Sequence, residues 1–529
     1  MLRTALVSIL ALAAAAPAAA QNALPSLPDT TGWGVHVLTV ARDSQGGVWA
    51  GTYGRGIFHL PVGGSDWRRI ESDTTDGSIS WDFVHALAFG PRGQIWYGTI
   101  GNGWGLSLDG GRTWRNWTFS ELGPEWQYVA PGGIATRGDT TMVGTADGIL
   151  VTTDDGARWT ALIDSTGPAA RGPADTAFVL LDNEYVLRVA TDSAGWLVEH
   201  LHGMQRIRHG SRGWESAAVS GAALPEHRQL TIDDVVLHAT RCGLRPGARA
   251  EEPCLIPGDP AAVRPADAPR PPLTTWFVRP VEPADNEYVD QTYRYGSTMG
   301  GNFQQHQGIE FNNPDGTPVH AIGGGRVVWA GPAEQGALTV AIRHDSTIAR
   351  AQARDTLSIY SVYYHNSALD VAVGDTVHAG QRIARVGHTG RATNDHLHLE
   401  IHAVPGDSTR LVVDPEQRYP PYTTNPELWI EQLAGTGIVA GQVFDSAGTP
   451  VAQARVYGIA KSVPPETPFS FAETYGARAH SHPLYGEHFA VGDVPPGTYL
   501  LAVDVADGRR VYREVTVEPG RVSWVVFRP

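Results

Sequence analysis

Short runs of hydrophobic and β-branched residues, each broken by a glycine, recur along the N-terminal part of the chain. Three of them are similar to one another, and they occupy residues 48–52 (VWAGT), 95–99 (IWYGT) and 142–145 (MVGT). Each is followed by a glycine-rich turn, another β-prone run and a tryptophan. Runs of this length between turns are typical of short β-strands. The pattern therefore predicts a repeated unit made of short strands.

The spacing of these units indicates how they assemble. A fainter fourth copy runs from 194 to 214. A period in the forties with four short strands per unit is typical of β-propeller blades, which must stack because one blade cannot bury its own faces. We therefore predict propeller-like repeats over residues 28–215, followed by a degenerate blade or a linker over residues 216–275.

Two of the units carry a sharper motif, at residues 107–114 (SLDGGRTW) and 152–159 (TTDDGARW). Both resemble the Asp-box of sialidase-like propellers, in which the aspartate satisfies backbone donors of a turn and the tryptophan packs between sheets. The resemblance implies a structural turn and not sugar cleavage, because a sialidase also needs an arginine cluster for the carboxylate of its substrate. The alternative is that the propeller binds a protein or glycan partner, or that it carries a glycosidase activity.

Strict alternation of polar and hydrophobic residues appears in the middle of the chain, first at residues 306–311 (HQGIEF). Residues i, i+2 and i+4 of an extended chain face one way, so His306 and Glu310 point together and the hydrophobic residues point into a core. Gly308 lies between the two and leaves room for an ion. An imidazole and a carboxylate on one face are good ligands for zinc.

The second alternating run covers residues 395–401 (DHLHLEI), where His396, His398 and Glu400 share one face. His365 follows an aromatic and β-branched run, so it is expected near the end of a strand. Together with the first run, these residues predict a metal-binding cleft in a β-rich segment. Five other histidines have no partner at ligand spacing and are left out of the predicted site: His320, His344, His378, His388 and His402.

The same region resembles the lysostaphin/LytM-type zinc metallopeptidases, which are peptidoglycan endopeptidases with a His-x-x-x-Asp motif and a His-x-His motif. The resemblance covers about residues 276–432. The matching blocks follow the order of the family, and they are residues 306–311, 314–319, 325–328, 373–377, 380–383, 386–390 and 396–400. The resemblance implies a central antiparallel β metallopeptidase domain, a bound Zn²⁺ ion, and peptidoglycan or another peptide as substrate.

A role for each polar residue also follows from the resemblance. The implied zinc ligands are His306, Glu310 and His398, the implied catalytic histidines are His365 and His396, and Tyr293 or Tyr295 is the implied stabiliser of the oxyanion. Three protein ligands leave one position of the zinc open for water, and a histidine can accept the proton of that water as general base. Which of the two histidines does so is left open.

Glu310 departs from the family pattern, which usually has aspartate at this position. Glutamate is longer by one methylene but is a competent zinc ligand, so we interpret Glu310 as a variant ligand. The alternative is a catalytically weak or inactive domain that binds cell-wall peptides or activates another wall hydrolase.

The C-terminal part, residues 437–529, again contains short alternating runs with close turns, such as 494–501 (VPPGTYLL). This pattern is typical of a β-sandwich, and it resembles the carboxypeptidase regulatory-like domain, an Ig-like sandwich. No catalytic set is found there. His480, His482 and His488 could bind a metal, but we expect them to lie in a mobile loop.

The N-terminal segment predicts export. Arg3 precedes a short apolar core, and residues 18–20 (AAA) offer small residues for cleavage, so residues 1–20 are expected to form a secretory signal peptide. The expected location is periplasmic or extracellular, without stable membrane insertion. In that oxidising setting Cys242 and Cys254 are expected to form a disulfide.

Composition supports an all-β multidomain protein. The chain has 61 glycines, 37 prolines and 16 tryptophans, with 18% charged residues, as expected for turn-rich β-structure. A net charge of -15 argues against a nucleic-acid partner held by phosphate contacts. We therefore expect N-terminal β-propeller-like repeats, a central antiparallel β metallopeptidase domain and a C-terminal Ig-like β-sandwich.

Overall fold

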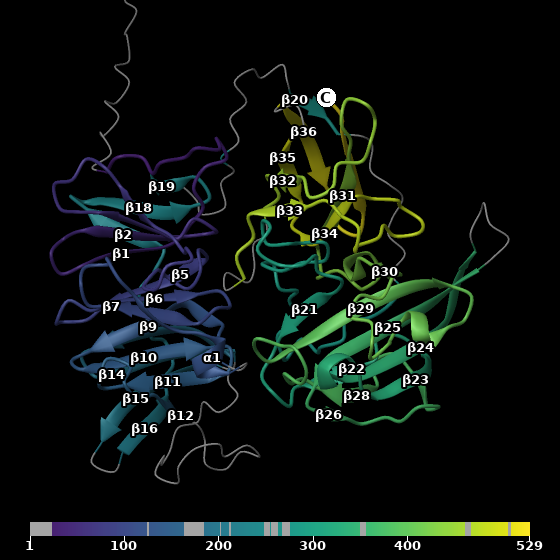
Figure 1. Cartoon of the computed structure of the whole chain (residues 1–529), viewed down its shortest axis with the longest axis horizontal. Helices are drawn as coiled ribbons and strands as arrows, with labels where there is room; N and C mark the ends of the chain where they lie inside the picture. The colour runs from purple at the N-terminus through teal and green to yellow at the C-terminus, as the bar shows by residue number, and fades with distance from the viewer. Residues whose placement is uncertain are drawn as a thin grey trace, which may run out of the picture.

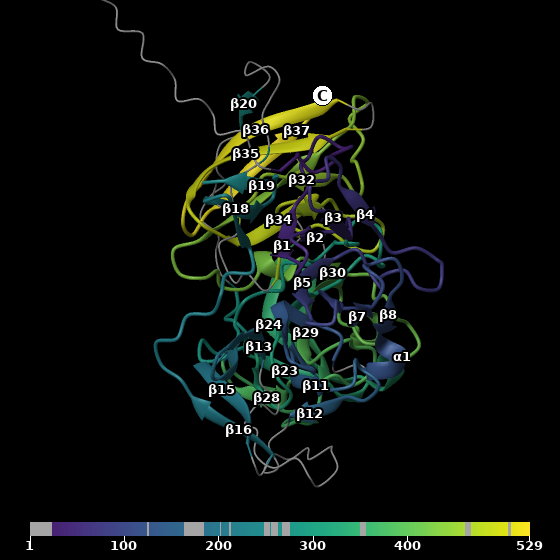
Figure 2. The same cartoon turned by 90° about the vertical axis from the view of Figure 1, so that its left-hand side faces the viewer.

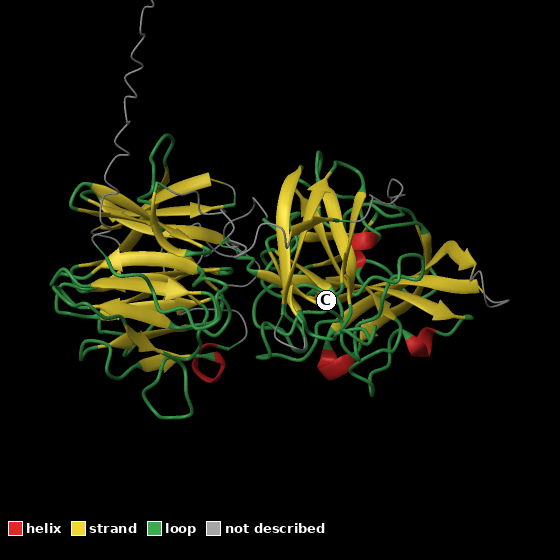
Figure 3. Cartoon of the chain, turned by 90° about the horizontal axis from the view of Figure 1, so that it is seen from above, coloured by secondary structure: helices red, strands yellow, loops and turns green. Residues whose placement is uncertain are grey.

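The described part of the chain is almost entirely β-structure, with only short helical turns (Figure 3). The strands form an N-terminal group, a central group and a C-terminal group, and the N-terminal group lies beside both of the others (Figures 1 and 2). No helix among the described residues is long and apolar enough to cross a membrane. The expected signal peptide lies outside the described residues. The computed structural model describes residues 24–123, 126–162, 185–201, 203–210, 213–247, 254, 263–266, 276–349, 356–460, 467–505 and 509–529.

The N-terminal group consists of four four-stranded antiparallel sheets and one three-stranded sheet, each with its strands in chain order. A short helix, α1 (Phe119–Leu122), follows the second sheet. The strands are β1 (Val37–Arg42), β2 (Val48–Thr52), β3 (Ile57–Leu60) and β4 (Arg68–Ile70); β5 (Val84–Phe89), β6 (Ile95–Thr99), β7 (Trp104–Ser107) and β8 (Arg115–Trp117); β9 (Val129–Arg137), β10 (Thr140–Thr145), β11 (Gly148–Thr152) and β12 (Thr160–Leu162); β13 (Val186–Asp192), β14 (Gly195–His200), β15 (Gly203–Gly210) and β16 (Gly213–Ala218); and β17 (Gln229–Ile232), β18 (Val235–Thr240) and β19 (Gly243–Pro246).

The first strands of these sheets pack against one another. Strand β1 contacts β5, β5 contacts β9, and β9 contacts β13, while β1 also contacts β17 and β18 of the three-stranded sheet. Part of the segment predicted as a degenerate blade or a linker is therefore a fifth sheet beside the first. The four-stranded units are present in the structure, and their closure into a propeller stays a prediction.

The glycine that recurs in each repeat has a packing role. A Cβ atom on Gly51 would lie 2.7 Å from the carbonyl oxygen of Val84, the first residue of β5. A Cβ atom on Gly98 would lie 2.5 Å from Cγ1 of Val129, the first residue of β9. Each glycine of a second strand therefore lets the first strand of the next sheet approach closely.

The two Asp-box-like segments form tight turns held by their aspartates. Oδ1 of Asp109 accepts hydrogen bonds from the backbone N–H groups of Arg112 (3.0 Å) and Thr113 (2.9 Å), and Oδ1 of Asp154 accepts one from the N–H of Arg158 (2.9 Å). Both aspartates make hydrogen bonds within their own turn, so their function is structural.

A disulfide links Cys242, in the turn between β18 and β19, to Cys254, with an S–S distance of 2.08 Å and a Cα–Cα distance of 5.1 Å. Further along the same segment, β20 (Val263–Pro265) pairs in parallel with β36 (Arg510–Val517) of the C-terminal group. The chain between the N-terminal and central groups thus adds an edge strand to the C-terminal group.

The central group contains a seven-stranded antiparallel sheet of order β21-β29-β25-β24-β23-β27, with β30 paired to β29, and a small sheet of order β22-β28-β26. Hydrophobic residues that alternate with the polar ones in β21 and β29 form its core, among them Ile309, Phe311, Leu397 and Leu399. The elements are β21 (Ile309–Asn312), β22 (Pro318–His320), β23 (Gly325–Pro332), η2 (Glu334–Gly336), β24 (Leu338–Ala349), β25 (Thr356–Asn366), β26 (Ala368–Leu369), β27 (Thr376–Val377), β28 (Arg382–Arg385), β29 (His396–Pro405), η3 (Thr409–Leu411), β30 (Thr423–Thr424) and η4 (Pro426–Leu428).

The C-terminal group has two sheets that share one hydrophobic core, so it is a two-layer sandwich. Their orders are β20-β36-β35-β32-β33 and β34-β31-β37. Its relation to Ig-like or carboxypeptidase regulatory-like domains stays a prediction. The remaining strands are β31 (Gly437–Val443), β32 (Arg455–Tyr457), β33 (Phe471–Glu473), β34 (Phe489–Val494), β35 (Gly497–Asp504) and β37 (Val522–Phe527).

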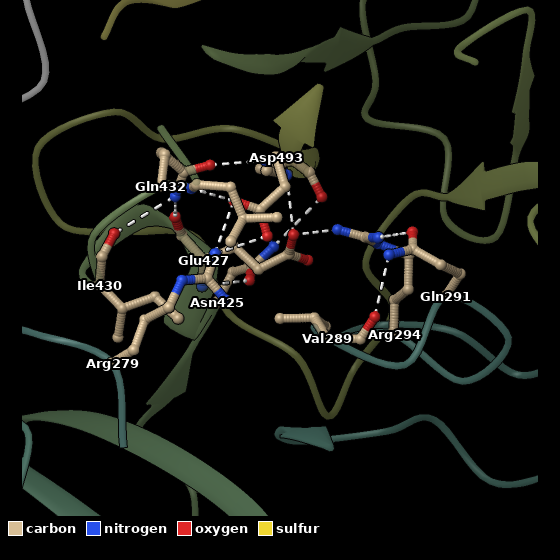
Figure 4. A network of polar contacts seen from close by, with 12 residues as sticks. Arg279, Val289, Gln291, Arg294, Asn425, Glu427, Ile430, Gln432 and Asp493 are labelled. Carbon is tan, nitrogen blue, oxygen red and sulfur yellow. Dashed lines mark hydrogen bonds and ion pairs between the residues drawn. The ribbon is translucent and has the colours of Figure 1, made fainter. Parts of the chain in front are cut away.

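A buried polar network joins the central group to the C-terminal sandwich (Figure 4). Arg279 binds both carboxylate oxygens of Asp493 at 2.6 Å, and Arg294 pairs with Glu427. The side chains of both pairs are at most 7% exposed. Glu427 also accepts a hydrogen bond from the backbone N–H of Gly492 at 2.7 Å. Buried charges of this kind require their partners, so the network fixes the two groups relative to each other.

Candidate metal centre

Three of the predicted metal ligands converge in the structure, because the register of the sheet places Glu310 of β21 opposite His398 of β29. Nε2 of His306 lies 3.2 Å from Oε1 of Glu310 and 3.1 Å from Nδ1 of His398. The same glutamate oxygen lies 3.9 Å from Nδ1 of His398. Ligand atoms on a tetrahedral zinc ion with bonds of about 2.0–2.2 Å lie about 3.3–3.5 Å apart. The three residues therefore form a donor set that fits Zn²⁺, and the additional methylene of Glu310 does not prevent its carboxylate from reaching the others.

Gly308 makes this arrangement possible. A Cβ atom at this position would lie 2.6 Å from Nε2 of His398 and 2.6 Å from the carbonyl oxygen of Leu399. The space beside Gly308 is thus occupied by the imidazole ring of His398, and not by an ion directly against the backbone as the sequence suggested. Glycine at this position lets a ligand-bearing strand pack against β21.

A carboxylate behind His398 fixes the orientation of its ring. Nε2 of His398 lies 3.3 Å from Oε1 of Glu400, and Oε2 of the same glutamate lies 2.8 Å from Nε2 of His402. Burial alone would raise the pKa of Glu400, but the hydrogen bonds with His398 and His402 outweigh it and lower the pKa to about 2. An ionised carboxylate on one ring nitrogen leaves the other nitrogen, Nδ1, directed at the metal position.

His365 and His396, the predicted catalytic histidines, lie beside the ligands. Each has its Nδ1 bound to a backbone carbonyl oxygen at 2.9 Å, that of Thr389 for His365 and that of Asn394 for His396. Nε2 of His396 lies 3.6 Å from Oε1 of Glu310. His365, His396 and His398 form a second group of potential ligand atoms within 4.8 Å of one another. Because their Nδ1 atoms are hydrogen-bonded to the backbone, both histidines present Nε2 to the site.

Two properties distinguish His365 from an ordinary surface histidine. Burial, followed by the positive charge of His396 and His398, lowers the pKa of His365 to about 3. The ring is therefore neutral near pH 7. Its backbone has a φ of 65°, in the left-handed region that residues other than glycine rarely adopt and that is often found at active sites.

The structure separates the two predicted oxyanion stabilisers. The ring of Tyr293 stacks on His306 with centroids 4.0 Å apart, and its hydroxyl donates to the carbonyl oxygen of Gln304 at 2.6 Å. The hydroxyl of Tyr295 donates instead to the carbonyl oxygen of Thr423 at 2.8 Å. Tyr295 is not among the residues of the cleft, so the structure brings only Tyr293 to the site.

Sequence reasoning did not single out Tyr364 and His402. Tyr364 pairs with His398 across β25 and β29, lies with its ring 5.6 Å from that of His398, and lines the cleft. Its hydroxyl has no hydrogen-bond partner within the described chain. The sequence signal for His402 was the continued alternation beyond Glu400, which places 402 on the same face of the strand as 396 and 398.

Two of the other excluded histidines, His344 and His388, serve the fold. Nδ1 of His388 lies 2.6 Å from Oδ1 of Asp395, and the two ring nitrogens of His344 bind a backbone carbonyl and Ser361. In the C-terminal sandwich, His482 is 1% exposed and its backbone N–H donates to Glu487. The expectation of a mobile loop does not fit His482, because its ring is buried against Trp429 of the central group, with centroids 4.3 Å apart.

The site opens into a cleft of about 470 Å³. Most of its wall comes from the central group, and Trp81, Ile100, Gly101 and Tyr128 of the N-terminal sheets complete it. Aromatic rings connect the two walls: Phe303 lies 5.5 Å from Trp81 and 5.5 Å from Tyr293. The cleft beside the metal ligands is therefore shared between the N-terminal and central groups.

Residues 304–415 match the sequence profile of Peptidase family M23. The chain is similar to the peptidoglycan DD-endopeptidase ShyB of Vibrio cholerae, with 31% identity over 132 residues, which are 23% of this chain and 28% of ShyB. It is also similar to the glycyl-glycine endopeptidase ALE-1 of Staphylococcus capitis, with 36% identity over 110 residues, 20% of this chain and 28% of ALE-1.

Among solved structures, the catalytic domain of lysostaphin from Staphylococcus simulans matches with 27% identity over 26% of this chain and 86% of that domain, at a TM-score of 0.19. The chain spans less than half the length of the curated relatives that it matches. The profile match and the two curated relatives support an M23-type peptidase segment in the middle of the chain, and this family suggests a metalloendopeptidase.

Proposed function

We propose that the protein is an exported zinc metalloendopeptidase that hydrolyses peptide bonds, with peptidoglycan cross-bridges as the substrate. The observation that carries the proposal is the convergence of His306, Glu310 and His398 on one point, with His365 and His396 beside it in an open cleft. The similarity to enzymes named for peptidoglycan and glycyl-glycine bonds supports the substrate class. The disulfide between Cys242 and Cys254 supports a periplasmic or extracellular location.

The mechanism assigns a task to each residue of the site. A zinc ion held by His306, Glu310 and His398 would polarise the peptide carbonyl and activate water. His365 and His396 present Nε2, so one can accept a proton from the attacking water and the other can give a proton to the leaving amine. The unpartnered hydroxyl of Tyr364 can donate a hydrogen bond to the oxygen that becomes negative.

The competing proposal of an inactive, peptide-binding domain rested on Glu310. Its carboxylate reaches the other ligands at 3.2 and 3.9 Å, and both non-ligand histidines are oriented toward the cleft. These observations favour turnover.

A propeller-led glycosidase would require an arginine cluster that is free to bind a carboxylate. Arg55, Arg241 and Arg455 line a small cavity between the three groups. However, Arg241 donates to the carbonyl of Ile459 and Arg455 to that of Gly300, so these two arginines join parts of the molecule to each other.

Variants of the two histidines that do not bind the metal test the proposal. His365→Ala and His396→Ala should retain zinc but lose about 100-fold or more in hydrolysis, the usual contribution of general acid–base catalysis. Zinc content and the release of peptides from purified peptidoglycan are measured together. Full activity in both variants would contradict the proposed mechanism.

A further inference from the structure

One arginine of the cleft has no ion-pair partner within the described chain. Five carboxylates line it, and each has a partner of its own within the described chain, whereas the wall formed by the N-terminal sheets carries no charged residue. Two arginines line the cleft, and one of them, Arg418, pairs with Glu334 at 3.5 Å. The other carboxylate partnerships are Glu310 with His306, Glu400 with His402, Asp414 with Arg410, and Asp290 with the side-chain amide of Asn312.

Arg391 is the second arginine of the cleft, and it differs from Arg418. Its side chain is exposed, and no carboxylate of the described chain lies within ion-pair distance of it.

The position of Arg391 relates it to the reacting groups. It follows β28 in the loop whose Thr389 carbonyl oxygen binds Nδ1 of His365. The next residue, Gly390, packs so closely on the opposite wall that an added Cβ would lie 2.6 Å from Cβ of Ala337. The loop is thus held at Thr389 and at Gly390. Arg391 follows directly, two residues after Thr389, whose carbonyl oxygen orients His365.

We propose that Arg391 binds a carboxylate that the substrate carries beside the scissile bond. The inference rests on the proposed peptidase function and specifies its substrate class as carboxylate-bearing stem peptides, in preference to uncharged oligoglycine bridges. A guanidinium group suits this task because it binds a carboxylate through two parallel hydrogen bonds. Each carboxylate of the cleft has a hydrogen-bond or ion-pair partner other than Arg391, so no ion pair has to be broken before Arg391 binds the substrate.

The test compares matched substrates and matched variants of the full-length, zinc-loaded protein. The substrates are a stem-peptide cross-link with a free carboxylate beside the scissile bond, the same peptide with that carboxylate amidated, and pentaglycine. The variants are Arg391→Gln and, as control, Arg382→Gln, which removes a cation of β28 that pairs with Asp370 outside the cleft. Both kcat/KM and the binding of fluorescent forms of the peptides are measured.

The wild type should cleave the carboxylate peptide about 10- to 100-fold more efficiently than the amidated one, as expected for a charge-assisted hydrogen bond. Arg391→Gln should remove that difference by lowering only the carboxylate value, while Arg382→Gln keeps it. Equal cleavage of both peptides by the wild type, or an equal loss for both in Arg391→Gln, would overturn the inference and leave the peptidase proposal intact.

Absence of hydrolysis with all three substrates would instead count against the peptidase proposal. The binding data then decide the inference. Tighter binding of the carboxylate peptide than of the amidated one, lost in Arg391→Gln, supports it. Equal binding of the two peptides overturns it.

Discussion

At the residue scale, the candidate metal centre depends on a few contacts of high specificity. Two ligands and the carboxylate behind them lie on adjacent strands, and the alternation of β-structure alone places them on one face. That is why the ligands could be predicted from the sequence. Tyr295 and Tyr364 were harder to place, because the direction of a tyrosine depends on which loop or strand packs over it.

Gly308→Ala tests how closely the ligands are packed. The new methyl group would collide with the His398 ring and with a backbone carbonyl oxygen, both at 2.6 Å. We expect a loss of at least about 10-fold in zinc affinity, as for changes that displace a ligand from its orientation. The control is Gly324→Ala, whose Cβ would have only one neighbour, at 3.6 Å. Unchanged zinc affinity in Gly308→Ala, measured by competition with a chelator, would contradict the geometry.

Acid should destabilise the fold through His344. Burial lowers the pKa of His344 to about 4, against a smaller opposite effect of its hydrogen bond to Gly324. Between the ordinary value near 6.5 and about 4, the unfolded state binds the proton and the folded state does not, so stability falls as the pH falls. From pH 7 to pH 5 the wild type should lose about 2 kcal/mol more unfolding free energy than His344→Gln. Denaturant unfolding at both pH values measures this difference, and parallel losses would refute it.

At the element scale, a glycine in the second strand of each of the first three sheets lets the next sheet approach closely. The sequence predicted the strands and their repeat, because both are local patterns. It did not predict that β20 would join the C-terminal sandwich, since a three-residue parallel pairing with β36 depends on a contact between segments more than two hundred residues apart. Closure of the sheets into a ring depends on long-range packing in the same way.

Gly98→Ala should weaken the contact between the second and third sheets. The added Cβ would lie 2.5 Å from Val129, and overpacking of this kind costs about 1–3 kcal/mol. The matched control is Gly101→Ala in the loop after β6, where the nearest atom would be 3.7 Å away. Guanidinium unfolding should show the loss in the first variant only. Equal stability of the two variants would show that the sheets do not pack as described.

At the scale of the whole molecule, the N-terminal and central groups enclose the cleft, and the C-terminal sandwich packs on the central group. The N-terminal sheets complete the wall of the cleft, and the C-terminal sandwich is fixed to the central group by the buried Arg279–Asp493 ion pair and by the hydrogen bond from Gly492 to Glu427. No local sequence pattern predicts such junctions, because Arg279 and Asp493 are separated by 214 residues. The N-terminal sheets are thus placed to shape access to the cleft.

Arg279→Met should destabilise the protein strongly. It leaves the carboxylate of Asp493 buried without its cation, which costs about 3–5 kcal/mol in comparable buried pairs. Arg382→Met is the control, because it removes a largely exposed ion pair worth about 1 kcal/mol or less. Thermal unfolding of both variants distinguishes them. A small shift in Arg279→Met would mean that the junction contributes little to stability.

The most direct test of the central claim is the zinc content of the purified protein, measured together with a mass-spectrometric digest of peptidoglycan. We expect about one zinc ion per chain and the release of peptide fragments, both lost in folded His398→Ala protein. A wild-type protein that folds, contains no zinc and still releases the same fragments would contradict it.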